Sequence, residues 1–181
     1  MNKLAIALAA SGMLALSIPT AASASMETEE AKMAAASAAD TARMDMMDTF
    51  GPKVLKPGQY VWANDPGSGP ARVVVSLTDQ MAYVYRGDRL VGVTTISSGK
   101  PGKDTPTGIF NVLEKQPMYR SKKYDNAAMP FMQRIDTYGI ALHAGRNPGE
   151  PASHGCVRLP SAFAAKLYQV TSVGTPVLIG A

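Results

Sequence analysis

Cysteine and histidine are scarce in this sequence, which has one cysteine and two histidines among its 181 residues. One cysteine cannot form an internal disulfide. Long hydrophobic runs are missing after residue 18, and no later segment is apolar enough to cross a bilayer. No internal repeats are found either. With 46% hydrophobic residues, the chain has enough apolar side chains for one globular domain and some unstructured chain, but not for two full domains.

The N-terminus has the pattern of a secretory signal peptide. Lys3 supplies a positive start, residues 4–18 form a largely apolar run, and Ala22-Ser23-Ala24 places small residues where a signal peptidase reads them. The alternative, a membrane anchor, is disfavoured because the run is shorter than the roughly 20 apolar residues of a membrane span. We therefore expect residues 1–24 to be removed. The mature protein is then expected in the periplasm or cell envelope, without stable insertion in the membrane.

Export makes the single thiol informative. A leftover cysteine in an exported protein is either reactive or destined to pair with another chain. Cys156 also lies too far from the expected cleavage site to accept a lipid there. From Arg72 onward the sequence has 13 Lys or Arg against 7 Asp or Glu. This surplus suits an anionic partner such as a cell wall, although a merely soluble surface explains it equally well.

The composition changes at about residue 70. Residues 25–50 are rich in Ala, Met and acidic residues, and they predict either a marginal helix or a flexible tether. Residues 51–70 contain repeated Gly-Pro and Pro-Gly pairs, typical of a turn-rich lead-in, with one short strand near Tyr60-Val61-Trp62. We therefore predict a linker over residues 25–70 and a folded domain over residues 71–181.

The second part of the chain has the pattern of β-strands. Apolar and polar residues alternate from Arg72 with a period of two, and Asp79-Gln80 and Gly87-Asp88 supply turns, which favours an antiparallel meander. One helix is predicted, with Ser161 as its cap. The fold class is therefore mainly β, a mixed β-sandwich or open barrel with one or two short helices. Strands are expected over residues 72–78, 81–85, 90–96, 108–113, 129–135, 138–143 and 176–179.

Both histidines lie within 13 residues of the only cysteine. Cys156 stands in Ser153-His154-Gly155-Cys156-Val157-Arg158-Leu159, and His143 ends a predicted strand. An imidazole in contact with a thiol can lower the thiol pKa from about 8.5, and it can later protonate a leaving amine. The cluster therefore predicts nucleophilic catalysis by Cys156.

His143 is the better candidate for the base. A tight turn at Gly155 would force His154 against the backbone, whereas His143 can approach the sulfur from another strand. His154 is then expected to orient the loop or donate a hydrogen bond. Gly155 also lets the N–H groups before and at Cys156 converge on one point, which is an oxyanion hole in outline.

Other interpretations stay open at this point. A lone cysteine is often an inert small hydrophobe. Cys156, His143 and His154 also supply the three protein ligands that a catalytic zinc ion needs. Arg158 suits a substrate carboxylate, but a surface ion pair explains it too. A non-catalytic wall-binding module is a further alternative, although such a module has no use for the Cys–His cluster.

These residues resemble the L,D-transpeptidase catalytic domain, also called the YkuD domain. Its hallmark is a His followed by [Ser/Thr]-His-Gly-Cys and commonly a hydrophobic residue and Arg. The Ser-His-Gly-Cys motif is specific, whereas the Thr-Pro-Thr-Gly turn at 105–108 alone would be weak. Similar segments follow in order between about residues 72 and 180, at 73–85, 97–102, 105–108, 129–132 and 174–177.

The resemblance implies a peptidoglycan L,D-transpeptidase of that fold, without metal or organic cofactor. The family's cysteine attacks the L-centre carbonyl of diaminopimelate in a stem tetrapeptide and expels D-Ala. A neighbouring stem's amine then resolves the thioester as a 3→3 cross-link. Carried over by position, Cys156 is the nucleophile and His143 the general base and acid. The implied supporting and oxyanion residues are Gly155, His154, Ser153 and Ala144. The implied substrate-binding residues are Arg158, Met129, Phe131 and Tyr138. The last three are equally plausible as core residues.

The implied partners are peptidoglycan stem peptides and not nucleic acid. Some members use water or a protein amine as acceptor, so an L,D-carboxypeptidase, or an enzyme that attaches an outer-membrane protein to the wall, is an alternative. Two departures from the family pattern matter. Only nine residues separate His143 from Ser153, so the loop over the acceptor side should be short. Ala144 follows the base where some members carry a small polar residue, so a backbone carbonyl has to orient the imidazole.

Overall fold

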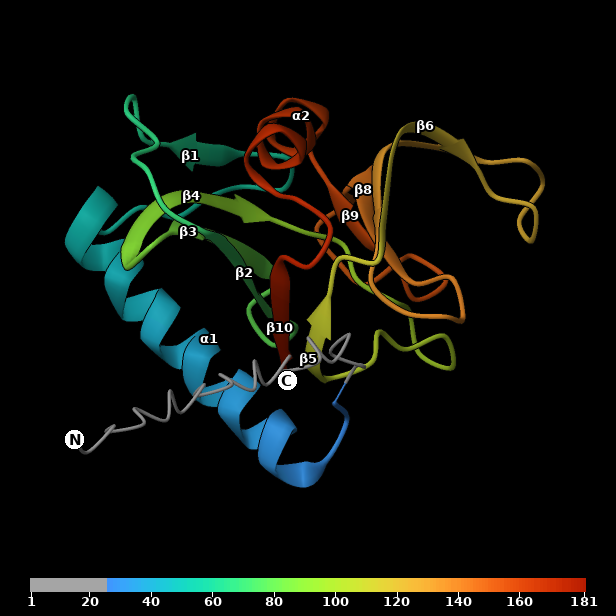
Figure 1. Ribbon diagram of the computed structural model, residues 1–181, viewed down its shortest axis with the longest axis horizontal. Coiled ribbons are helices and arrows are strands. Elements are labelled where there is room, and N and C mark those ends of the chain that lie inside the picture. Colours follow the sequence, from blue (N-terminus) through green and yellow to red (C-terminus); the bar gives the residue numbers. More distant parts are fainter. Residues whose placement is uncertain (1–25) are drawn as a thin grey trace, which may run out of the picture.

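The computed structural model describes residues 26–181, and the predicted signal peptide lies outside this range. The described chain forms ten strands in two sheets and two helices, which confirms the mainly β class (Figure 1). The six-stranded sheet has the order β1-β4-β3-β2-β10-β5, and the four-stranded sheet has the order β6-β7-β8-β9. The strands are β1 (Tyr60–Trp62), β2 (Ala71–Ser76), β3 (Met81–Arg86), β4 (Arg89–Thr95), β5 (Gly108–Asn111), β6 (Glu114–Arg120), β7 (Ala128–Arg134), β8 (Ala141–Ala144), β9 (Val157–Leu159) and β10 (Pro176–Gly180).

Three strands differ from the predictions: β8 starts later than expected, and neither β6 nor β9 was predicted. The strand expected from residue 138 starts only at Ala141, because Asp136 Oδ1 accepts hydrogen bonds from the Gly139 and Ile140 amides and holds that segment in a turn. β6 was not predicted, since Pro117 interrupts it and its burial does not alternate. The parallel pairs β8–β9 and β10–β2 are the exceptions to an otherwise antiparallel fold.

Helix α1 (Glu29–Phe50) is the first of the two alternatives that the sequence left open for residues 25–50, a helix or a flexible tether. Thr28 caps its first turn by accepting a hydrogen bond from the Ala31 amide at 3.3 Å, and Gly51 ends it with a φ of +77°. The helix lies along the outer face of the six-stranded sheet (Figure 1). Its buried side chains recur every three or four residues and are mostly alanines: Ala31, Ala35, Ala39, Ala42 and Met46.

Small side chains let α1 approach the sheet closely. At Gly180 of β10, a Cβ atom would lie 2.7 Å from the Ala36 Cα atom, so only glycine fits there. The Tyr85 hydroxyl of β3 donates a 2.7 Å hydrogen bond to Asp45 of α1. The helix is therefore a layer of the fold and not a free tether.

Both faces of the six-stranded sheet are buried as a result. Val73 and Val75 face the main core, which the four-stranded sheet and α2 (Ser161–Val170) close, whereas Val74 packs under α1. The predicted helix α2 is confirmed, with Phe163 and Leu167 buried. Its cap is different: Pro160 occupies the N-cap position without a side-chain hydrogen bond, and Ser161 is the first helical residue. In residues 26–181 no helix has both the length and the apolarity of a bilayer span.

Thr105 ties the loop after β4 to the loop that carries Cys156. The Gly99 amide donates to the Thr105 hydroxyl at 2.9 Å, and this hydroxyl donates to the Gly155 carbonyl at 2.8 Å. The Ser97 backbone also pairs with Arg158 at 3.0 and 3.1 Å. These contacts give the Thr-Pro-Thr-Gly segment a structural purpose, because they fix the position of the cysteine loop.

We predict that Thr105→Val lowers the free energy of unfolding by about 1–3 kcal/mol, because the buried Gly99 amide and Gly155 carbonyl both lose their partner. Urea unfolding measures this change. Thr107→Val is the matched control, since the Thr107 hydroxyl makes no hydrogen bond to the described residues. Equal stabilities for the two variants would contradict the bridging role.

Candidate active site

A cleft of about 790 Å³ brings Cys156 and His143 together. Strands β6, β7 and β8 line it, together with the turn between β6 and β7 and the loop before β9. Ser153, His154 and Arg158 lie on its wall as well. The cleft therefore contains the predicted nucleophile, the predicted base and their neighbours in the motif.

The loop before β9 has a fixed internal geometry. Gly155 has a φ of +113°, and a Cβ there would lie 2.6 Å from the Ile140 Cδ1 atom, so glycine is required. The Ser153 hydroxyl accepts from the Gly155 amide at 3.0 Å and donates to the Cys156 carbonyl at 2.5 Å. The Gly155 N–H is thus already engaged, which removes it from the predicted oxyanion donors.

His143 is buried in β8, and its register partner in β9 is Arg158. The Nδ1 atom lies 2.8 Å from the Ala144 carbonyl oxygen. A carbonyl can only accept, so Nδ1 carries the proton and Nε2 is left as the basic nitrogen. Ala144 therefore supplies the orienting carbonyl that the sequence could not identify. Burial lowers the pKa of His143 against the effect of this hydrogen bond, and the Arg158 guanidinium lowers it further.

Cys156 is half-buried, and its thiol lies 3.7 Å from the Gly139 carbonyl oxygen, to which it donates. Burial raises the pKa of the thiol above its ordinary range. The Asp136 carboxylate raises this pKa too, while the Ala141 amide, Arg158 and Arg134 lower it. No histidine contributes to this shift, so the expected lowering of the thiol pKa by His143 is absent. At neutral pH the two directions favour a neutral thiol and a neutral imidazole.

His154 is exposed, and its ring stacks on Tyr124 of the β6–β7 turn, with centroids 4.4 Å apart and an interplanar angle of 20°. It thus joins the motif to the hairpin that forms the opposite wall. Within residues 26–181, no three His, Cys, Asp or Glu side chains are grouped to hold a metal ion. The zinc interpretation of Cys156, His143 and His154 therefore has no support in the geometry.

The predicted substrate-binding residues divide into two groups. Arg158, Met129 and Tyr138 line the cleft, with Tyr138 at 85% exposure. Phe131 does not, which corrects its predicted role: its ring packs against Tyr168 of α2, with centroids 5.9 Å apart. Strand alternation would put Phe131 on the side of Met129, but a φ of +55° interrupts the strand at Phe131.

Sequence reasoning missed the basic wall of the cleft. Only Asp125 opposes its cations, and one cation, Arg134, is paired with Glu114 at 2.8 Å. Two of its cations, Lys122 and Lys123, lie in the turn after the unpredicted β6, and the Lys-Lys-Tyr run was their only signal in the sequence. The cleft therefore favours an anionic ligand. The cationic lining residues are Lys122, Lys123, Arg134, Arg146 and Arg158.

Comparison with known sequences agrees with this geometry. The family model described as the L,D-transpeptidase catalytic domain, YkuD, matches residues 70–179. The putative L,D-transpeptidase YkuD of Bacillus licheniformis is 29% identical over 135 residues, which are 71% of this chain and 74% of that protein. The putative L,D-transpeptidase YqjB of Bacillus subtilis is 29% identical over 136 residues, which are 66% of this chain and 77% of that protein.

Solved structures show the same fold. An L,D-transpeptidase from Stackebrandtia nassauensis matches with a TM-score of 0.57 and 25% identity, over 75% of this chain and 64% of that one. An L,D-transpeptidase from Mycobacterium smegmatis matches with a TM-score of 0.57 and 24% identity, over 61% of this chain and 58% of that one. The match spans less than two thirds of either solved chain. Because the family model covers residues 70–179, more than half of the 181, the chain belongs to the L,D-transpeptidase catalytic domain family.

Proposed function

We propose that this protein is an exported peptidoglycan L,D-transpeptidase of the cell envelope. In this proposal a stem tetrapeptide acylates Cys156 at diaminopimelate, D-Ala leaves, and an amine acceptor resolves the thioester as a 3→3 cross-link. The observation that carries the proposal is the shared cleft of Cys156 and a His143 whose Nε2 is left basic. Family membership supports the reaction class.

The resting protonation states set the order of the proton transfers. His143 Nε2 accepts the thiol proton as the sulfur attacks the scissile carbonyl, which forms a tetrahedral oxyanion. The same imidazolium then protonates the leaving D-Ala amine, and a thioester remains on Cys156. The acceptor amine next attacks the thioester, His143 takes its proton, and the sulfur recovers that proton as it leaves. Because Ser153 engages the Gly155 amide, we assign oxyanion binding to the Cys156 amide.

The charge of the cleft supports a donor that ends in a carboxylate beside the scissile bond. D-Ala is the last residue of a tetrapeptide, so its α-carboxylate lies next to the carbonyl under attack. Arg158 is near enough to both catalytic groups to lower the pKa values of Cys156 and His143. We therefore assign Arg158 to this carboxylate, with Met129 as an apolar wall and Tyr138 at the rim.

Covalent capture by a β-lactam tests the nucleophile. A solved L,D-transpeptidase of this fold is described as a complex with imipenem, a carbapenem, so a carbapenem is the probe. We predict that a carbapenem adds its mass once to the intact wild-type protein and not to Cys156→Ala. His143→Gln should slow the addition by about 10²- to 10⁴-fold, the usual effect of a general base. Arg89→Gln, outside the cleft, is the control and should stay near the wild-type rate. An adduct that persists in Cys156→Ala would remove the proposal.

The pH dependence tests the resting protonation states. Burial puts the pKa of His143 below its ordinary value of 6.5, so the base is lost only under acidic conditions. Carbapenem acylation should therefore increase as the pH rises through a midpoint below 6.5, and then level off. Iodoacetamide reacts with the thiolate, so labelling of Cys156 should have a midpoint above pH 9.0. A labelling midpoint in the acidic range would indicate a resting thiolate–imidazolium pair and contradict this account.

The role of Arg158 predicts a preference between two tetrapeptides, one with a free C-terminal carboxylate and one with a C-terminal amide. The wild type should favour the free acid in kcat/KM by about 10- to 100-fold, because a charge-assisted hydrogen bond is worth roughly 1.5–3 kcal/mol. Arg158→Gln should abolish this preference. Arg89→Gln, which breaks an exposed pair with Asp65 outside the cleft, should leave it unchanged. An unchanged preference in Arg158→Gln would refute the assignment.

A further inference from the structure

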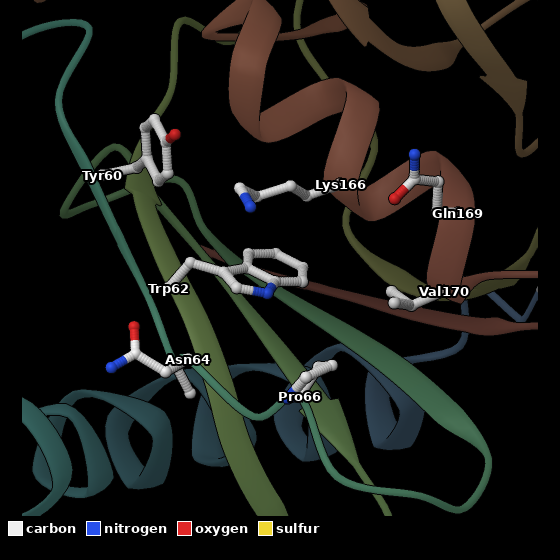
Figure 2. A pocket seen from close by; sticks show the side chains of 8 residues that line it. Tyr60, Trp62, Asn64, Pro66, Lys166, Gln169 and Val170 are labelled. Carbon is white, nitrogen blue, oxygen red and sulfur yellow. The ribbon is translucent and has the colours of Figure 1, made fainter.

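A second pocket, of about 460 Å³, lies between helix α2 and the segment of β1 and its following loop (Figure 2). Tyr60 and Trp62 of β1 form one wall, and Lys166 and Gln169 of α2 face them. Its lining residues are all different from those of the Cys156 cleft. The proposed reaction therefore leaves the chemistry of this pocket unused.

The aromatic wall is built before any ligand arrives. Tyr60 and Trp62 are two residues apart in β1, and both rings meet Phe163 edge-on, with centroids 5.8 and 5.3 Å away. Gly92 is the register partner of Trp62 in β4, and a Cβ there would lie 2.4 Å from the indole Cε3 atom. The indole therefore rests directly on the backbone of β4. Trp62 remains partly exposed to the pocket.

Polar groups surround this aromatic wall. The Lys166 Nζ atom lies 5.8 Å from the centre of the Trp62 ring. Asn64 and Gln169 are exposed, and in the described part of the chain their side-chain amides make no hydrogen bond to protein. Each amide offers two donor hydrogens and an acceptor oxygen. No carboxylate lines the pocket, so its residues do not suit a cationic ligand.

We propose that this pocket binds a saccharide, namely a β-1,4-linked N-acetylated amino sugar. A pyranose ring has an apolar C–H face, which fits an indole, and a rim of hydroxyl and acetamido groups, which fits amide side chains and an ammonium group. A lipid would need a larger apolar lining, and a simple anion would have no use for the indole. The inference rests on the proposed function, because the glycan strand of peptidoglycan carries the stem peptides on such sugars.

The position of the pocket gives this binding a purpose. The pocket lies on the side of α2 that faces β1, while α2 also contacts β7 and β8, strands that line the catalytic cleft. One rigid helix thus connects the two sites. A sugar held at Trp62 would keep the polymer on the enzyme while a stem peptide reaches Cys156.

Trp62 is the only tryptophan of the chain, so its fluorescence reports on this pocket alone. The probe is the tetramer of β-1,4-linked N-acetylglucosamine, titrated into the full mature chain. We expect a saturable change in emission with a Kd of about 1 mM or tighter. The double variant Asn64→Ala/Gln169→Ala keeps the indole and its packing, and should bind at least about tenfold more weakly. Cys156→Ser and Gln116→Ala, which alters an amide outside both sites, should bind like the wild type.

The outcomes separate this inference from the proposed function. No emission change with the tetramer, together with normal carbapenem acylation, would overturn the saccharide site and leave the transpeptidase intact. An equal change in the double variant would also overturn it, because the amides would then contribute nothing. Saturable binding without acylation would support the pocket and refute the proposed reaction. If the wild type both binds the tetramer and is acylated by the carbapenem, the double variant should turn over a sugar-free tetrapeptide at the normal rate. It should turn over polymeric cell wall more slowly.

Discussion

The left-handed backbone at Gly155 decides where the thiol lies. Its φ of +113° turns the loop so that Cys156 comes directly before β9, which pairs with β8, and this backbone conformation is strained for any residue other than glycine. Ser153 holds the turn from inside and Thr105 holds it from the neighbouring loop. The parallel pairing of β8 and β9 then sets His143 opposite Arg158. The positions of the proposed base, the proposed nucleophile and Arg158 thus follow from one turn and one strand pair.

Burial has opposite effects on His143 and Cys156, the two proposed catalytic groups, and this suits the proposed export. It lowers the pKa of His143 and raises the pKa of Cys156, which favours the uncharged form of each group at neutral pH. The thiolate is the form that oxidants attack. A thiol that stays protonated until substrate binds is protected in an oxidising compartment. The cost is a proton transfer during the reaction, which the fixed tautomer of His143 makes easier.

Local patterns predicted what depends on local sequence. Alternation located most strands, and the scarcity of Cys and His indicated the pair that the structure brings to one cleft. The packing of α1 was not predictable, because a face made of alanines differs little in polarity from the rest of the helix. The sequence alone therefore does not distinguish this packed helix from a flexible tether. The side chain of Phe131 was assigned to the wrong face of the strand because the sequence Met-Pro-Phe-Met gives no sign of a positive φ at this residue. The direction of the thiol pKa shift depends on burial by residues from β7, β8 and the turn at 136–140, and no short motif contains that information.

The two layers around the six-stranded sheet explain why the site can be rigid in so small a domain. With α1 on one face and the main core on the other, β2, β3 and β10 are buried on both sides. Helix α2 is anchored in that core through Phe163 and Leu167. Phe163 also supports Tyr60 and Trp62, while α2 packs against β7 and β8 behind the cleft. A displacement of α2 would therefore disturb the aromatic wall and the strands behind the cleft together, which makes this helix the structural link between the proposed sugar pocket and the proposed acyl-transfer site.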